Sequence, residues 1–104
     1  MPMERNGLPR LDARVRLFQN AQDPTGLLAF ADLVIDGAFV IKGICIRAGK
    51  SDPSSPFLSF PAKKGTGEAK DRYFDIAYPI TAEAHHLAKE IILQKYREAV
   101  GGNE

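Results

Sequence analysis

The feature that most constrains this chain is a pair of apolar segments joined by Asp36 and Gly37. Residues 27–35 are almost entirely apolar, and residues 39–46 return with a second apolar run. An Asp-Gly dipeptide supplies two positions that tolerate positive φ, which tight β-hairpins prefer. We therefore expect an antiparallel hairpin, with residues 27–35 covered on both faces or lying centrally in a sheet.

Residues 13–17 predict a strand before this hairpin. Arg14 and Arg16 alternate there with apolar residues, as in a strand with one buried face. Residues 19–26 contain Asp-Pro and a glycine and predict the turn that leads to the hairpin.

After the hairpin, two loops alternate with two short extended segments. Residues 48–56 and 62–71 contain several glycine, serine, proline or charged residues and predict loops. Residues 57–60 predict a short strand that ends at a proline, and residues 75–80 predict an extended segment.

Residues 82–99 predict one amphipathic helix. Its apolar residues fall on one side of a helical wheel, Thr81 is suited to cap its N-terminus, and the glycines at 101 and 102 end it. The predicted fold class is therefore α+β, with a small, mostly antiparallel sheet of four to five strands and one C-terminal helix. Since one helix covers one face of a sheet, we expect a homodimer to cover the other.

The length of 104 residues indicates one domain, which we place at residues 10–100 with flexible tails at 1–9 and 101–104. A single cysteine, Cys45, excludes an internal disulfide. No apolar run reaches the roughly 18–20 residues that a membrane-spanning helix needs, and charged residues interrupt the N-terminal segment. We expect a cytoplasmic protein without a membrane partner.

The sequence shows no pattern typical of catalysis or metal binding. His85 and His86 are adjacent on the predicted helix and point about 100° apart, so they cannot chelate one ion. Cys45 lies between isoleucines and is expected to be a small buried hydrophobic residue. We expect no enzyme activity, no cofactor, no metal and no small-molecule substrate.

Positive charge is concentrated in two short segments, although the net charge is only +1. Residues 1–20 and residues 61–72 each carry four cations against two carboxylates. Within the second segment Lys63 and Lys64 precede a glycine, and Lys70 and Arg72 follow in the same loop. Lysines on a mobile loop can contact the phosphates of DNA or RNA and release counterions. The alternative is a solvated loop whose lysines only maintain solubility.

Three further residues could extend this site. Arg14 and Arg16 lie on one face of the first predicted strand, where they extend a basic surface or protect an edge strand from pairing. Tyr73 follows the basic loop and could stack on an unpaired base.

Several short segments follow one another in a characteristic order between residues 15 and 80. They are Val15-Arg16, Asp36-Gly37 followed by Phe39-Val40-Ile41, Ile44 and Ile46 with Gly49, residues 57–61, Lys63-Lys64, Asp75-Ile76-Ala77 and Pro79-Ile80. In this order and spacing the chain resembles the stage V sporulation protein G (SpoVG-like) family.

This resemblance implies a bacterial, homodimeric α+β protein that binds DNA and RNA and influences septation, sporulation or gene expression. It implies Lys63 and Lys64 as nucleic-acid contacts. The chain departs from the family at Cys45 and Phe74, where arginine is usual, and at Tyr78, where histidine is usual. The alternative function is a protein–protein interaction module of the cell-division machinery that does not bind nucleic acid.

Overall fold

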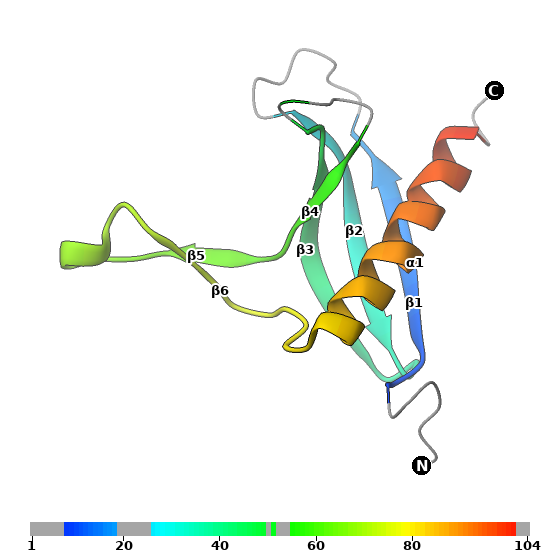
Figure 1. Ribbon diagram of the computed structural model, residues 1–104, viewed down its shortest axis with the longest axis horizontal. Helices are drawn as coiled ribbons and strands as arrows, with labels where there is room; N and C mark the ends of the chain where they lie inside the picture. The colour runs from blue at the N-terminus through cyan, green and yellow to red at the C-terminus, as the bar shows by residue number, and fades with distance from the viewer. Residues whose placement is uncertain (1–7, 19–25, 50, 52–54, 102–104) are drawn as a thin grey trace.

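The computed structural model describes residues 8–18, 26–49, 51 and 55–101. Four strands form the main sheet in the order β1-β2-β3-β4, and every neighbouring pair is antiparallel (Figure 1). They are β1 (Leu11–Leu17), β2 (Leu27–Ile35), β3 (Phe39–Arg47) and β4 (Phe57–Ser59). A second sheet pairs β5 (Ala62–Lys64) with β6 (Tyr73–Asp75), and α1 (Ala82–Gly101) follows. The predicted α+β fold class is confirmed.

The hairpin between β2 and β3 turns at the predicted dipeptide. Asp36 and Gly37 have φ values of 55° and 66°, and the Ala38 N–H donates a hydrogen bond of 3.0 Å to the Ile35 carbonyl. Strand β2 lies in the interior of the sheet, as expected for its apolar sequence.

Asp36 also connects the hairpin to the start of β1. Its N–H donates to the Arg10 carbonyl at 2.7 Å, and its Oδ1 accepts from the Arg10 N–H at 2.9 Å. One residue therefore forms the turn and pairs with the neighbouring strand.

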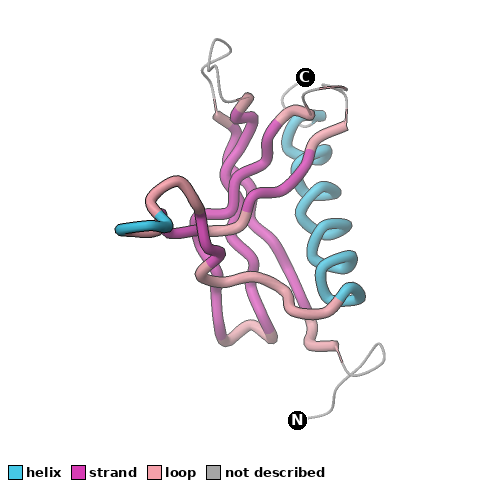
Figure 2. The backbone as a smooth tube through the Cα atoms, turned by 60° about the vertical axis from the view of Figure 1, so that its left-hand side comes forward, coloured by secondary structure: helices cyan, strands magenta, loops and turns pink. Residues whose placement is uncertain are grey.

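Helix α1 packs on one face of the main sheet (Figures 1 and 2). Thr81 caps it as predicted, since the Ala84 N–H donates to the Thr81 Oγ1 at 3.1 Å. Ala88 and Ile92 of α1 are fully buried. The buried core consists of Ala13, Ala29, Ala31, Leu33, Ile44, Ile46, Phe60, Ala88 and Ile92.

A β-bulge interrupts the pairing of β2 with β3. Ala31 pairs with Ile44 and Leu33 pairs with Ile41, so Asp32 lies opposite two residues of β3. One of these is Gly43, whose φ of 85° is readily adopted by glycine. The extra residue lets Ile41 and Ile44 both contribute to the core side despite their odd spacing.

The prediction of a loop at residues 62–71 was wrong in part. Lys63 and Lys64 belong to β5, and only residues 65–72 connect it to β6, through a 3₁₀ turn at Gly67–Ala69. The predicted extended segment overlaps β6 at Asp75 alone, and residues 76–80 are irregular. The helix continues to Gly101. Residues 19–25, 50, 52–54, 1–7 and 102–104, which include most of the predicted first turn, part of the second loop and most of both tails, lie outside the described residues.

The β5–β6 sheet projects from the rest of the molecule (Figures 1 and 2). The radius of gyration is 14.9 Å, against about 13 Å for a compact chain of this length. The projection accounts for this excess, because the main sheet and α1 form one compact unit.

Replacing Ile92 tests the core between α1 and the sheet. We expect Ile92→Ala to lower the free energy of unfolding by about 2–5 kcal/mol, because it removes a fully buried side chain and leaves a cavity. Val100→Ala, on an exposed part of the same helix, is the control and should cost less than about 0.5 kcal/mol. Urea unfolding measures both, and equal effects would contradict the described packing.

Candidate nucleic-acid interface

The projecting element comprises residues 61–76 and is called the arm below. At its base the Ile76 N–H donates to the Pro61 carbonyl at 2.7 Å, and near its tip the Gly65 N–H donates to the Arg72 carbonyl at 2.9 Å. Between these bonds β5 pairs with β6. Neither strand has an extensive contact with another described element. The arm is therefore a two-stranded ribbon held together by its own hydrogen bonds.

The tip of the arm depends on a glycine. A Cβ on Gly65 would overlap the Ala69 carbonyl oxygen and would lie 2.9 Å from Cε2 of Phe74. The Phe74 ring therefore lies against the Gly65 backbone, in space that no side chain at position 65 could share.

The arm brings together five of the residues that the sequence predicted as contacts. Lys63, Lys64, Lys70, Arg72 and Tyr73 are all exposed on it. Because side chains alternate along a strand, the two adjacent lysines project from opposite faces of the ribbon. The register pairs Lys63 with Phe74 and Lys64 with Tyr73, so each face carries one lysine beside one aromatic ring.

The charges of the arm are nearly balanced in number. Its four cations share the ribbon with three carboxylates, those of Glu68, Asp71 and Asp75. Within the described part of the chain, however, none of the four cations forms an ion pair. All four cationic groups can therefore reach a phosphate without first breaking an intramolecular pair.

Arg14 and Arg16 lie away from the arm, on β1 of the main sheet. Alternation along β1 puts them on the face opposite α1, since Ala13 and Val15 contribute to the core. Arg16 Nη1 lies 3.3 Å from Oδ2 of Asp32 on β2. The predicted contacts thus fall on two separate surfaces.

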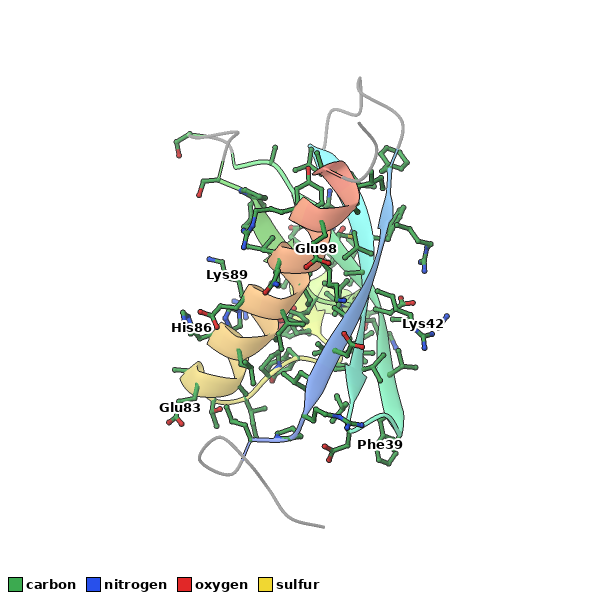
Figure 3. The ribbon with its side chains drawn as sticks, turned by 90° about the vertical axis from the view of Figure 1, so that its right-hand side faces the viewer. Phe39, Lys42, Glu83, His86, Lys89 and Glu98 are labelled. Atoms are coloured by element: carbon green, nitrogen blue, oxygen red, sulfur yellow. The ribbon has the colours of Figure 1, made fainter. Side chains whose placement is uncertain are left out.

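The sequence did not single out Lys42, which lies on the same face as Arg14. Together with Val34 and Val40 these two residues line a shallow hollow of about 230 Å³. Figure 3 shows Lys42 on the side of the sheet opposite α1. A lysine within an apolar strand is a visible signal in the sequence. The bulge at Gly43 breaks the alternation of side chains, however, so the sequence pattern does not show on which face Lys42 lies.

The remaining candidates have structural surroundings. His85 and His86 are exposed on α1, with His85 near the Phe60 ring and Nε2 of His86 3.2 Å from Oε1 of Glu90. Cys45 is half-buried on β3 and not part of the core, so its predicted burial was wrong. Among the described residues no three potential metal ligands cluster.

Apolar side chains are exposed along the arm and the segment that follows it. They are Tyr73, Phe74, Ile76, Tyr78 and Ile80. Tyr78 and Ile80 also border an apolar cavity of about 210 Å³ between the main sheet and the start of α1.

Among the described residues, no helix combines the length and the apolar composition that spanning a membrane requires.

Comparison with known proteins identifies related chains. The SpoVG family model matches residues 10–98. A protein of Finegoldia magna named "Putative septation protein SpoVG" is 33% identical over 72 residues, which are 69% of this chain and 61% of that protein. A protein of Clostridioides difficile with the same name is 30% identical over 89 residues, 86% of this chain and 87% of that protein.

Substitution of Gly65 tests the structure of the arm. We expect Gly65→Ala to increase amide hydrogen exchange throughout residues 61–76 by at least about tenfold, because the methyl group displaces Phe74 and opens the ribbon locally. The thermal midpoint should change little, since the arm contacts the main sheet weakly. Thr66→Ala is the control, because the Thr66 side chain makes no capping hydrogen bond at the tip. Unchanged exchange in Gly65→Ala would contradict the described tip.

Proposed function

Because this chain belongs to the SpoVG family, we propose that it is a nucleic-acid-binding regulatory protein that contacts the phosphates of DNA or RNA with its arm. The observation that carries the proposal is the exposure of four cations without ion-pair partners on one projecting ribbon. The family likeness supports the position of the site, since a basic pair is usual where Lys63 and Lys64 stand.

The shape of the arm supports this function. A two-stranded β-ribbon is one of the elements that the major groove of B-DNA admits. With one lysine on each face, such a ribbon reaches the phosphates on both sides of the strand or groove that it enters. The aromatic neighbours Tyr73 and Phe74 give it an apolar surface for unpaired bases.

The names of the related proteins connect the family to septation. We propose a cytoplasmic regulator of septation, sporulation or gene expression that acts as a homodimer, without a cofactor, a small-molecule substrate or a catalytic step. In a dimer two arms would bind the same nucleic acid, which raises the effective concentration of the second arm after the first has bound.

The salt dependence of binding tests the arm. We expect Lys63→Ala/Lys64→Ala to reduce the slope of log K against log salt concentration by about two units on duplex DNA, because two phosphate contacts are lost. Fluorescence anisotropy of a labelled 20-base-pair duplex and of labelled single strands, titrated at two or more salt concentrations, measures this slope.

The matched control for this experiment is Lys89→Ala/Arg97→Ala. It removes the same charge from exposed positions of α1, one of which, Lys89, is visible in Figure 3. A general effect of net charge would change both double variants equally. The proposal fails if the arm variant keeps the wild-type slope and affinity on every probe.

A second candidate function is protein interaction through the exposed apolar row. Ile80 is 86% exposed and Ile76 is 65% exposed, in a segment that continues from the arm. Large apolar side chains grouped on a surface favour contact with another protein. The partner could be a second copy of this chain or a component of the division machinery.

Two charged substitutions distinguish these partners. We expect Ile76→Asp/Ile80→Asp to shift the wild-type homodimer to monomer, because two carboxylates would be desolvated in the contact. Sedimentation velocity over a range of concentrations measures the shift, with Val100→Asp on α1 as the control. A dimer that survives in the double variant would assign the apolar row to a different protein.

A further inference from the structure

The face of the main sheet opposite α1, called the open face below, carries a group of residues that the arm does not include. Alternation and strand register place them on it, because their neighbours in each strand belong to the core. They are Arg14, Arg16, Phe30, Asp32, Lys42, Cys45 and Phe57. We infer that the open face is a second binding surface, for single-stranded nucleic acid. The inference rests on the proposed function in one respect only, namely that the ligand is a nucleic acid.

The open face, like the arm, carries more cations than carboxylates. Arg14 and Lys42 are exposed, and Arg16 is 62% exposed at its side chain. Among the described residues of this face, Asp32 and Asp12 are the carboxylates. Asp12 lies at the sheet edge, where its Oδ1 is 4.0 Å from Nζ of Lys95 on α1. Asp32 is the carboxylate that lies next to Arg14 and Arg16, opposite Arg14 in the register and paired with Arg16.

That carboxylate has an unusual environment. Asp32 is only 4% exposed, and its Oδ1 is buried without a hydrogen-bond partner among the described residues. Most buried polar atoms are hydrogen-bonded, so this oxygen leaves the Asp32 carboxylate with unused acceptor capacity beside Arg16.

The ion pair with Asp32 makes Arg16 a suitable phosphate ligand. A guanidinium has five N–H donors, and the contact with Asp32 Oδ2 uses one of its nitrogens. Asp32 therefore restrains the Arg16 side chain above the sheet and leaves further donors directed to solvent. In this role Asp32 is a positioning residue for Arg16.

Two aromatic rings lie on the open face, with Phe30 opposite Arg16 in the strand register and Phe57 opposite Arg47 on the far edge strand. Phe57 is 42% exposed on β4, and Phe30 of β2 is half-buried with the Phe18 ring packed edge-on against it at 5.9 Å. Unpaired bases stack on exposed aromatic rings whatever their sequence, while nearby cations contact the backbone. A broad antiparallel sheet cannot enter a duplex groove as a narrow ribbon can, so this combination favours a single strand.

The composition of the open face argues against a second copy as its occupant. A two-fold contact buries the same patch of both partners, so the cations of two copies, Arg14 and Lys42 among them, would share one buried interface. The two carboxylates of the face, Asp32 paired with Arg16 and Asp12 near Lys95 of α1, do not neutralise these cations. A polyanionic strand complements the same cations.

The test compares two open-face variants and one control variant on defined probes. The probes are a labelled 12-nucleotide oligouridine, the equivalent oligothymidine and a DNA duplex. We expect Arg14→Ala/Lys42→Ala to reduce the salt slope for the single strands by roughly 1.4 units, because two contacts are lost, and to leave duplex binding within twofold of wild type. Phe57→Leu should weaken single-strand binding by about fivefold or more through lost stacking. Lys89→Ala/Arg97→Ala is again the charge control.

Photocrosslinking identifies the contact surface directly. With 4-thiouridine in the oligonucleotide, we expect crosslinked peptides from β1, β3 or β4 in the wild-type protein and in Lys63→Ala/Lys64→Ala. Crosslinks confined to the arm, with wild-type affinity in the open-face variants, would overturn this inference and leave the proposed function intact. If the wild-type protein binds none of the probes, the proposed function fails first. If Arg14→Ala/Lys42→Ala instead converts a dimer to monomer in sedimentation, the open face is a subunit contact and the inference is wrong.

Discussion

The register between β2 and β3 determines which side chains of the main sheet meet α1. The turn at Asp36 and Gly37 sets this register, and a shift by one residue would exchange the two faces of a strand. The small residues Ala29 and Ala31 lie on the covered face, where α1 packs, while Asp32 lies on the other. Because Asp36 also bonds to Arg10, the turn aligns β1 as well. The separation of an apolar core from a cationic face therefore follows from one hairpin.

Much of this architecture could be predicted from local sequence signals. The Asp-Gly turn, the period of two around Arg14 and Arg16, and the Thr81 cap each act over a few residues, and the structure confirms each of them. The fold class followed from their order. The basic residues of the arm were also identified, because a cluster of charge in a short segment is visible without knowledge of the fold.

The parts that were missed depend on contacts between distant residues or on irregular backbone. Strands β5 and β6 have three residues each, too few for a periodic pattern, and they are stable only as a pair across the tip. The bulge at Gly43 changes the alternation in the middle of β3, so the placement of Lys42 could not be obtained by counting. The burial of Asp32 depends on three strands together. For these reasons the sequence indicated one basic site, whereas the structure separates its residues between the arm and the open face.

The hydrogen bond between Ile76 and Pro61 has a mechanical consequence. It joins the two chain segments that enter and leave the arm, so a rotation at this base would move both strands and the tip together as one unit. The arm could then change its angle to the main sheet while β5 stays paired with β6. The base of the arm lies between the two proposed binding surfaces, the arm and the open face. If both proposed sites are occupied, the angle between arm and sheet would depend on both nucleic acids, and distance measurements between spin labels on Thr66 and α1 would report it.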